Sequence, residues 1–414
     1  MGVQSINLSV TLDDKYVKES GYVYMTGLQA LVRAPLVQRR RDKAAGLNTA
    51  GYVTGYRGSP LSAYDRELLI AQKHLDADGV TFEPGLNEDL AATALWGSQQ
   101  VGIFGKPKYE GVFGIWYGKN PGLDRSGDPF KHANYAGTAK LGGVLAVVGD
   151  DHAAKSATIC NQSEYTFMTH NMPVLSPADV QDVHDYALFG WAMSRYSGCW
   201  VGFKVEPNNM DRTQTICVDP ERVQIKTPTD FDMPPGGLSI RWPDNQYDQE
   251  ARLLDFKLKA AQAFVRANKM DRTEFDRPTA RFGIVTTGKS YLDTHEALNT
   301  LGIDEARAKE LGIAIYKVAM PWPMEPVGAK AFCEGLDEIL VVEEKQPVME
   351  DQLRSLLYDL PAGKRPRIVG KKDESGQELL TAKMGLHSHE IAAAISQRLL
   401  GLTNDAQVRE ALGK

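Results

Sequence analysis

The 414-residue sequence contains only four cysteines, and they are scattered along the chain. No two of them form a Cys-x-x-Cys pair, and no histidine lies beside them at the spacing of a metal site. Lone cysteines of this kind are typically buried and behave as small hydrophobic residues. Iron–sulfur clusters need closely spaced thiolates, so the sequence predicts no cluster in this chain. The four residues are Cys160, Cys199, Cys217 and Cys333.

Long apolar runs and an excess of basic charge are also absent. No run approaches the roughly twenty apolar residues that cross a bilayer. The first residues have neither a basic start nor an apolar core, so no signal peptide is predicted. The net charge of −6 gives no basic surface for nucleic acid. We therefore expect a cytoplasmic protein that binds neither membrane nor nucleic acid.

The rest of the composition is that of a globular protein with a substantial core, with 43% hydrophobic and 24% charged residues. The length suits two or three domains. Short apolar strands alternate with helices, which is typical of parallel sheets covered on both faces. We predict an α/β fold of two doubly wound domains with mainly parallel sheets, at residues 1–220 and 249–414, joined by a proline- and glycine-rich linker at residues 221–248.

Open parallel sheets bind ligands at the carboxyl ends of their strands, so the residues after each strand are the candidates for a functional site. In the first domain we expect strands at 50–54, 80–83, 109–117, 143–149, 173–175 and 199–206, and helices at 60–74, 88–104 and 177–194. In the second we expect strands at 280–286, 313–318 and 338–343, and helices at 249–268, 290–301, 327–332, 349–360 and 388–400.

The turn after the first expected strand reads Gly55-Tyr56-Arg57-Gly58-Ser59-Pro60. Its glycines allow a ligand to approach the backbone closely, and the helix N-terminus beyond favours an anion. Arg57 adds a charge suited to a carboxylate. The alternative is a tight turn with a surface arginine, because the turn matches neither the P-loop nor the dinucleotide fingerprint.

Glu88 follows the second expected strand, beside Asn87, and begins an alanine-rich helix. A glutamate at a helix start is often no more than a favourable partner for the helix dipole. This helix is too rich in alanine to be a solvated face, so we expect the Glu88 carboxylate to point into the crevice at the strand ends.

Two further strand ends carry polar residues. Segment 116–129 places Lys119, Asn120 and other charged residues among glycines and prolines, which is typical of a ligand-holding loop and equally consistent with a structural one. Gly149-Asp150-Asp151-His152 hints at a metal–diphosphate motif. Asp151 replaces the glycine expected there, and no suitably spaced asparagine pair follows, so we predict no metal site.

Taken in order, these segments resemble the alpha-type half of the thiamine-diphosphate-dependent 2-oxoacid:ferredoxin oxidoreductases, and most closely indolepyruvate ferredoxin oxidoreductase. The family's Gly-Tyr-Pro-Gly-Ser/Thr-Pro turn is similar to residues 55–60, and its Asn-Glu pair to Asn87-Glu88. Its Lys-x-x-Gly-Leu-Asn loop resembles residues 119–124, and its Asp-Asp stretch before a Pro-Val-Leu strand resembles residues 150–175. Gly283–Tyr291 and Val341–Glu344 look like the transketolase C-terminal-type domain of the same enzymes.

The resemblance implies that Glu88 is catalytic, because the family's glutamate hydrogen-bonds N1′ of the cofactor's aminopyrimidine ring. That bond stabilises the imino tautomer, which takes the thiazolium C2 proton, and the activated cofactor then holds the electron pair left by decarboxylation. It also implies cofactor contacts from Glu88, Asn87, Gly58, Ser59 and Pro60, and substrate contacts from Arg57, Ser59, Lys119 and Asn120.

The chain departs from the family pattern in two ways. Arg57 replaces a proline, and no Gly-Asp-Gly…Asn element for Mg²⁺ and diphosphate is present. The resemblance therefore implies that thiamine diphosphate is shared with a diphosphate-binding domain or subunit, while Mg²⁺ and iron–sulfur clusters lie outside this chain. It further implies a gamma-type subunit or domain, ferredoxin and an oligomer, with a 2-oxoacid and coenzyme A as substrates.

The identity of the 2-oxoacid stays open at this point. Tyr56, Trp116 and Tyr117 favour an aryl pyruvate such as indolepyruvate by stacking, but aromatic residues at strand ends are also ordinary core. A non-catalytic assembly or scaffold subunit is an alternative that predicts loss of the key carboxylate, whereas Glu88 is present. An unrelated nucleotide-binding enzyme requires a phosphate fingerprint, and the sequence contains none.

Overall fold

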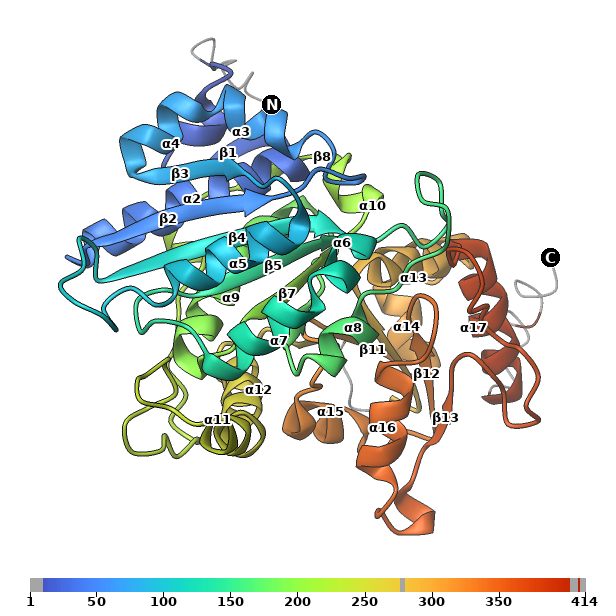
Figure 1. Cartoon of the computed structure of the whole chain (residues 1–414). Coiled ribbons are helices and arrows are strands. Elements are labelled where there is room, and N and C mark those ends of the chain that lie inside the picture. The colour runs from blue at the N-terminus through green and yellow to red at the C-terminus, as the bar shows by residue number, and fades with distance from the viewer. Residues whose placement is uncertain (1–9, 276–279, 403–408, 410–414) are drawn as a thin grey trace.

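The first α/β unit is built on a six-stranded parallel sheet (Figure 1). The computed structural model describes residues 10–275, 280–402 and 409. The strand order is β3-β2-β4-β5-β7-β6, and every neighbouring pair is parallel. The strands are β2 (Thr49–Gly55), β3 (Val80–Pro84), β4 (Gly111–Lys119), β5 (Val144–Gly149), β6 (Val174–Leu175) and β7 (Val201–Val205).

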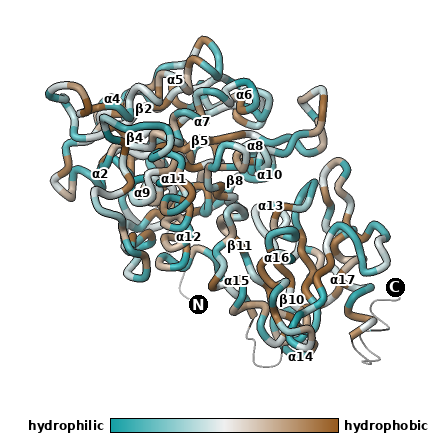
Figure 2. Tube along the Cα trace, turned by 60° about the horizontal axis from the view of Figure 1, so that its bottom comes forward, coloured by the Kyte–Doolittle hydropathy of each residue, from teal (hydrophilic) through white to brown (hydrophobic). Residues whose placement is uncertain are grey.

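Helices cover both faces of this sheet, so its strands are apolar on both sides. All six residues of β5 are buried, and Figure 2 shows hydrophobic segments gathered around this strand. One face packs against α2 (Gly27–Ala44), α3 (Tyr64–Ile70), α4 (Gln72–Asp78) and α9 (Val180–Ser197). The other packs against α5 (Glu88–Ser98), α6 (Asn120–Arg125), α7 (Gly127–Ala136) and α8 (Glu164–Thr169).

The second unit has a five-stranded sheet in the order β13-β12-β10-β11-β9, parallel except for β9 at one edge. Its strands are β9 (Arg272–Glu274), β10 (Phe282–Thr287), β11 (Ile313–Val318), β12 (Glu338–Val342) and β13 (Arg367–Val369). One face packs against α13 (Gly288–Thr300), α14 (Glu305–Leu311) and α17 (Ser388–Leu402). The other packs against α15 (Pro326–Cys333) and α16 (Met349–Leu357). The predicted α/β class with two doubly wound, mainly parallel sheets is confirmed.

Smaller elements complete the described chain. A two-stranded antiparallel sheet joins β1 and β8, which are far apart in the sequence. No element before residue 50 was predicted from the sequence. These elements are α1 (Asp14–Val17), β1 (Tyr22–Thr26), α10 (Pro207–Met210), β8 (Thr213–Cys217) and the 3₁₀ turns η1 (Pro220–Arg222) and η3 (Ala362–Lys364). No described helix carries an apolar stretch long enough to span a bilayer.

The helix expected at 249–268 packs on the first unit, although the predicted boundary assigned it to the second. It runs through α11 (Gln246–Arg252), a π-helical turn η2 (Leu253–Lys257) and α12 (Leu258–Ala267). Ala261 and Phe264 of α12 belong to the apolar core that includes α9. The second sheet therefore starts after this helix, at β9.

A buried lysine on the π-helical turn strengthens this attachment. The Nζ atom of Lys257 donates to the carbonyl oxygens of Asn134, at 3.2 Å, and Tyr135, at 3.0 Å. Both carbonyls belong to the last turn of α7, where a cation is favoured by the helix dipole. Both the apolar face and the polar face of this helix therefore contact the first unit.

Two expectations from the sequence are corrected. Segment 116–129 is not a loop, because β4 continues to Lys119 and is followed by α6 and the start of α7. Pro121 and Pro129 lie in the first turns of these helices, where proline is tolerated. Of the cysteines expected to be buried, Cys160 is exposed and Cys217 half-buried.

Candidate functional site

The turn after β2 packs tightly against the ends of β4 and β5. A Cβ atom added at Gly55 would lie 2.1 Å from the carbonyl oxygen of Tyr117, and one at Gly58 would lie 2.9 Å from Cβ of Lys119. A Cβ at Gly149 would lie 2.5 Å from Cδ of Pro60. The carboxyl ends of the three strands are therefore packed closely together, because small residues line their contacts.

Glu88 lies at the same edge, as the first residue of α5. The side chain of Asn87 accepts a hydrogen bond from the backbone N–H of Leu90 at 2.8 Å, so Asn87 is the N-cap of this helix. The indole N–H of Trp116 donates to the carbonyl oxygen of Glu88 at 2.9 Å. The start of α5 is thus fixed from both sides.

The carboxylate of Glu88 lies against α6. A Cβ added at Gly122 would lie 2.4 Å from Cγ and 2.8 Å from Oε1 of Glu88, so a glycine leaves the space that this side chain fills. Glu88 itself is half-buried. The structure therefore brings Glu88 and the turn at residues 55–60 to one edge of the sheet.

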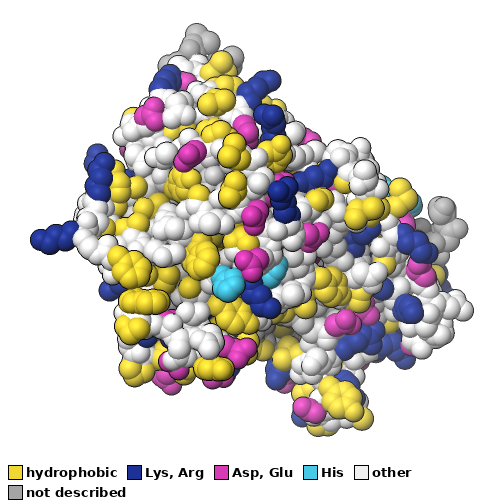
Figure 3. Space-filling model, in the orientation of Figure 1, with side chains coloured by type: hydrophobic (Ala, Val, Ile, Leu, Met, Phe, Trp, Pro, Cys, Tyr) yellow, Lys and Arg dark blue, Asp and Glu magenta, His cyan; other side chains and the backbone are white. Residues whose placement is uncertain are grey.

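Large apolar side chains lie exposed on the segments that carry Glu88 and the turn. Leu86 is 86% exposed, Leu90 49% and Tyr56 39%, and Arg57 is also exposed. Figure 3 shows hydrophobic side chains among charged ones on the face that carries α5 and α6. Leu86 and Leu90 each lie two residues from Glu88 in the sequence, so exposed apolar side chains flank this carboxylate along the chain.

Two of the three aromatic residues considered for substrate stacking are core residues instead. Trp116 packs edge-on against Phe130 at a centroid distance of 4.8 Å, and Tyr117 packs against Tyr64 at 5.0 Å. Both are fully buried. Tyr56 is the member of this group that stays at the surface.

Lys119 lies at the end of β4 and holds the loop that follows β5. Its Nζ atom donates to the carbonyl oxygen of Ser156 at 2.7 Å and contacts the hydroxyl of Ser156 at 3.3 Å. Asp151 fixes that loop by accepting from the backbone N–H groups of Lys155, at 2.9 Å, and Ser156, at 2.7 Å. Burial opposes ionisation of Asp151, but these hydrogen bonds outweigh it and lower its pKa.

Asn120 is not exposed at the strand ends in the way expected of a substrate-binding residue. It is buried, and its amide donates to the hydroxyl of Ser163 at 2.8 Å. That hydroxyl in turn donates to Asp150. Asn120 therefore belongs to an internal hydrogen-bond network that leads toward the second unit.

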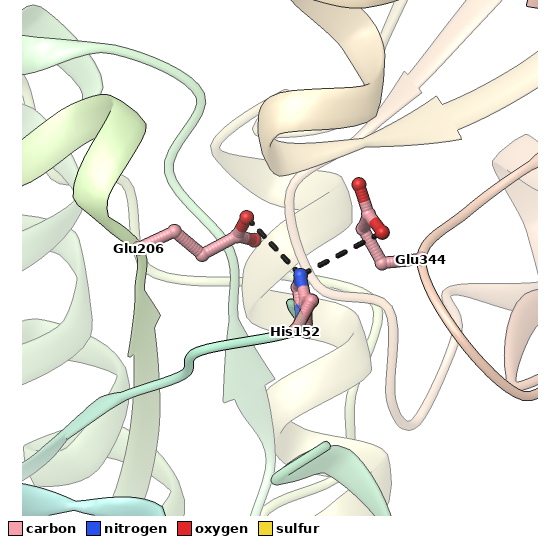
Figure 4. A group of neighbouring side chains, drawn as sticks. All are labelled: His152, Glu206 and Glu344. Carbon is pink, nitrogen blue, oxygen red and sulfur yellow. Dashed lines mark ion pairs between the residues drawn. The ribbon is translucent and has the colours of Figure 1, made fainter. Parts of the chain in front are cut away.

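A second group of polar residues lies where the two units meet (Figure 4). His152 follows β5, Glu206 follows β7, and Glu344 follows β12 of the other sheet. Nδ1 of His152 lies 3.4 Å from Oε2 of Glu206 and 3.7 Å from Oε2 of Glu344. All three residues are buried. The carboxyl ends of β5, β7 and β12 are thus closed by side chains of the chain itself.

Two lysines hold the other oxygens of these carboxylates. Nζ of Lys204 lies 3.6 Å from Oε1 of Glu206, and Nζ of Lys289 lies 2.9 Å from Oε1 of Glu344. Burial opposes the charges of His152, Glu206 and the two lysines, but the opposite charges outweigh it. They raise the pKa of His152 to about 10 and lower the pKa of Glu206, while the pKa values of Lys204 and Lys289 are raised.

The two glutamates that follow β12 have different roles. The Glu343 carboxylate accepts from the backbone N–H groups of Val348, Met349 and Glu350 and so organises the start of α16. Glu344 reaches across to His152. His152 and the Glu343-Glu344 pair belong to motifs noted in the sequence, whereas Lys204 and Glu206 were missed. These two residues lie at or just after the end of β7, and that position at a strand end is the signal that could have identified them.

Comparison with known proteins supports a single family. The indolepyruvate oxidoreductase domain family matches residues 272–414. The indolepyruvate oxidoreductase subunit IorA of Pyrococcus horikoshii is 27% identical over 344 residues, covering 81% of this chain and 47% of that protein. The subunit of the same name from Methanothermobacter thermautotrophicus is 22% identical, covering 81% and 49%. The chain therefore spans about half the length of the curated relatives it matches.

Solved structures share the fold of most of the chain. A 2-oxoglutarate:ferredoxin oxidoreductase from Magnetococcus marinus, with 2-oxoglutarate, coenzyme A and succinyl-CoA bound, superposes with a TM-score of 0.64 at 15% identity, covering 92% of this chain and 66% of that one. A split-gene transketolase superposes with a TM-score of 0.53 at 14% identity, covering 91% and 98%. The family resemblance drawn from the sequence is confirmed, and the chain is similar to indolepyruvate oxidoreductase subunits over most of its length.

Proposed function

We propose that this chain is the pyrimidine-side part of a 2-oxoacid:ferredoxin oxidoreductase. The reaction is the thiamine-diphosphate-dependent oxidative decarboxylation of a 2-oxoacid to acyl-CoA, with an aryl pyruvate such as indolepyruvate as substrate. The observation that carries the proposal is the half-buried Glu88 carboxylate at an open strand edge, on a segment with exposed Leu86 and Leu90. The names of the relatives support the reaction and the substrate.

The described residues fit one end of thiamine diphosphate. A carboxylate within an apolar rim suits the aminopyrimidine ring, whose N1′ needs a hydrogen-bond partner and whose faces are apolar. Among the described residues, the one group with metal-ligand geometry is the buried His152 cluster, which lies between the two units. We therefore assign Mg²⁺ and the diphosphate to a partner domain or subunit, and the iron–sulfur clusters to further partners such as a gamma-type subunit and ferredoxin.

When bound, the cofactor supplies the electron sink for decarboxylation. Glu88 holds a proton at N1′, and Asn87 and Trp116 keep the start of α5 in place while it does so. Gly58, Ser59 and Pro60 lie at the same edge of the sheet. The exposed leucines exclude water once a partner covers them, which strengthens the carboxylate's hydrogen bond.

Arg57 and Lys119 are the cations proposed to meet the substrate carboxylate. An ammonium has three N–H donors, and Lys119 directs donors to the carbonyl and hydroxyl oxygens of Ser156. The carboxylate of a substrate can therefore accept a hydrogen bond from the remaining N–H of Lys119. Asn120 is not among the proposed substrate contacts, because its amide is engaged in the interior. A cytoplasmic location and an oligomeric complex are part of the same proposal.

The test is reconstitution with the remaining subunits or regions of the complex, comparing Glu88→Gln with Asp89→Asn. Both changes remove one negative charge from the first turn of α5, so a helix-dipole role predicts equal effects. We expect Glu88→Gln to reduce 2-oxoacid-dependent dye reduction by at least about a hundredfold, in line with a lost proton-transfer group, and Asp89→Asn to have little effect. Equal activities would leave Glu88 as a helix-end residue and support an assembly role for the chain.

Calorimetry gives a second readout that does not depend on turnover. We expect thiamine diphosphate and Mg²⁺ to bind only in the presence of the partner region, and more weakly with Glu88→Gln. Binding by this chain alone would contradict the assignment of the diphosphate site to a partner.

A further inference from the structure

We propose that a protonated His152 is a charged link between the two units, bound by Glu206 of the first and Glu344 of the second, and that it fixes how the units are docked. This inference concerns the closed part of the sheet edge and is independent of the proposed function.

The positions of the two ring nitrogens carry the argument. Nδ1 faces the carboxylates of Glu206 and Glu344 at 3.4 Å and 3.7 Å, and Nε2 faces Oδ2 of Asp150 at 3.5 Å. Carboxylate oxygens only accept hydrogen bonds, and a neutral imidazole carries one N–H. A neutral ring would therefore point a lone pair at a buried carboxylate. The imidazolium form turns an N–H and positive charge toward both sides, in ion pairs at these distances.

The surrounding charges also favour a cation at this position. Five carboxylates belong to the network, against three lysines, so a proton on His152 reduces the excess of negative charge. Lys345 donates to the backbone carbonyl oxygen of His152 at 3.2 Å, so this hydrogen bond does not involve the imidazole ring. The carboxylates are those of Asp150, Glu164, Glu206, Asp293 and Glu344, and the lysines are Lys204, Lys289 and Lys345.

A bound divalent metal ion is the competing explanation. Ligand atoms of His152, Glu206 and Glu344 lie within 4.8 Å of one another, which is compact enough for one. Lys204 and Lys289 already hold the second oxygens of these carboxylates, so an ion would lie close to two ammonium groups. Each carboxylate therefore offers an ion one remaining oxygen, so the cluster supplies three ligand atoms, fewer than the four of a structural zinc site. A proton on the ring needs no such ligand set.

The other described contacts near this link are mostly neutral. Backbone N–H groups of Val174 and Ser176 donate to the carbonyls of Trp322, at 2.7 Å, and Ala319, at 2.9 Å. Further ion pairs between the units join Lys317 of β11 to Asp182 of α9 and Arg266 of α12 to Glu325 at the start of α15. The His152 link differs from these pairs because its charge depends on a titratable proton held by groups of both units.

The direct test uses nuclear magnetic resonance on the unchanged chain, labelled with ¹⁵N only at histidine. We expect both ring nitrogens of His152 to show the chemical shifts of an imidazolium at pH 8, where histidines of the urea-unfolded chain are neutral. The resonances are assigned by their loss in His152→Gln. A neutral His152 ring at pH 8 would overturn the proposal.

Variants test the mechanical role. We expect His152→Gln and Glu344→Gln each to increase the rate of proteolysis between α12 and β9 by about tenfold or more, and the double variant to add little. The control is His132→Gln, which removes an exposed histidine that faces an aspartate four residues earlier. Rates equal to this control would overturn the proposal.

The metal content of the purified chain tests the competing explanation. If the unchanged chain contained one equivalent of zinc and His152→Gln contained none, the proposal would also be overturned.

Discussion

The carboxyl edge of the first sheet has an open half and a closed half. At the open half, after β2, β3 and β4, Glu88 lies against Gly122 on segments that expose Leu86 and Leu90. At the closed half, after β5 and β7, the second unit covers the strand ends, and charged side chains fill the contact. One sheet edge thus has a half-buried carboxylate with exposed apolar neighbours beside a contact filled by its own chain.

The difference between the halves follows from the cost of burying charge. A buried carboxylate is tolerated only when cations and hydrogen-bond donors accompany it, and the closed half supplies them through His152, Lys204 and Lys289. The open half keeps its carboxylate partly in solvent. We expect changes in the closed half to affect stability first and changes in the open half to affect activity first.

The largest effect is expected for Lys204→Met in the closed half. The change leaves Glu164 and Glu206 buried without their shared cation, so unfolding by urea should show a loss of about 3–5 kcal/mol. Lys383→Met is the matched control, because Lys383 pairs with Glu378 on the surface and should contribute about 1 kcal/mol or less. Similar losses in both variants would contradict the distinction between buried and exposed pairs.

Alkaline pH should weaken the closed half before the open one. The pKa of His152 is raised to about 10 in the folded chain from about 6.5 in an unfolded one. A raised histidine pKa contributes stability that is complete below about pH 6.5 and lost as the pH rises through 10. The free energy of unfolding should therefore fall across this window, and fall less in His152→Gln. Parallel pH profiles for the two proteins would contradict the prediction.

Gly122→Ala should affect activity more than stability. The added Cβ would lie 2.4 Å from Cγ of Glu88 and displace its side chain, at a cost in stability of about 1–3 kcal/mol. We expect most of the activity of the reconstituted complex to be lost while the chain stays folded by circular dichroism. Gly97→Ala in the same helix as Glu88 is the control, because a Cβ there has no neighbour within 4 Å among the described residues and should be neutral or stabilising. Full activity of Gly122→Ala would show that the position of the carboxylate is not critical.

The smallest effect is expected for Asn87→Ala. Loss of this N-cap should destabilise the chain by about 1 kcal/mol and loosen the start of α5 without displacing the Glu88 carboxylate. Hydrogen exchange at the N–H of Leu90 would report the loosening. Unchanged exchange there would mean that the indole of Trp116 alone fixes this helix start.

Local patterns predicted much of the fold. Apolar runs indicated the central strands, and residues 313–318 were predicted with the observed bounds of β11. Helix α2 was missed even though Thr26 and Gln29 form a capping box at its start, a signal that was available. The prediction for segment 116–129 was wrong because its prolines suggested a loop, whereas they lie in the first turns of two helices.

The sequence by itself determined which residues are the candidates at the open half. Glycines at a strand end and a glutamate at a helix start are local features, because neighbouring residues fix the backbone that carries them. The order of these residues along the chain was sufficient to recognise them, and the likeness to the oxidoreductase family followed from the same order.

Only the tertiary structure decided which distant side chains meet. His152, Glu206 and Glu344 come from two sheets and three strand ends, and no periodicity in the sequence links them. The same holds for the helix at 246–267, whose amphipathic pattern did not show which sheet it covers. The physical reason is that burial and ion pairing between the units depend on how the units pack together. That packing is determined by many contacts between residues far apart in the chain.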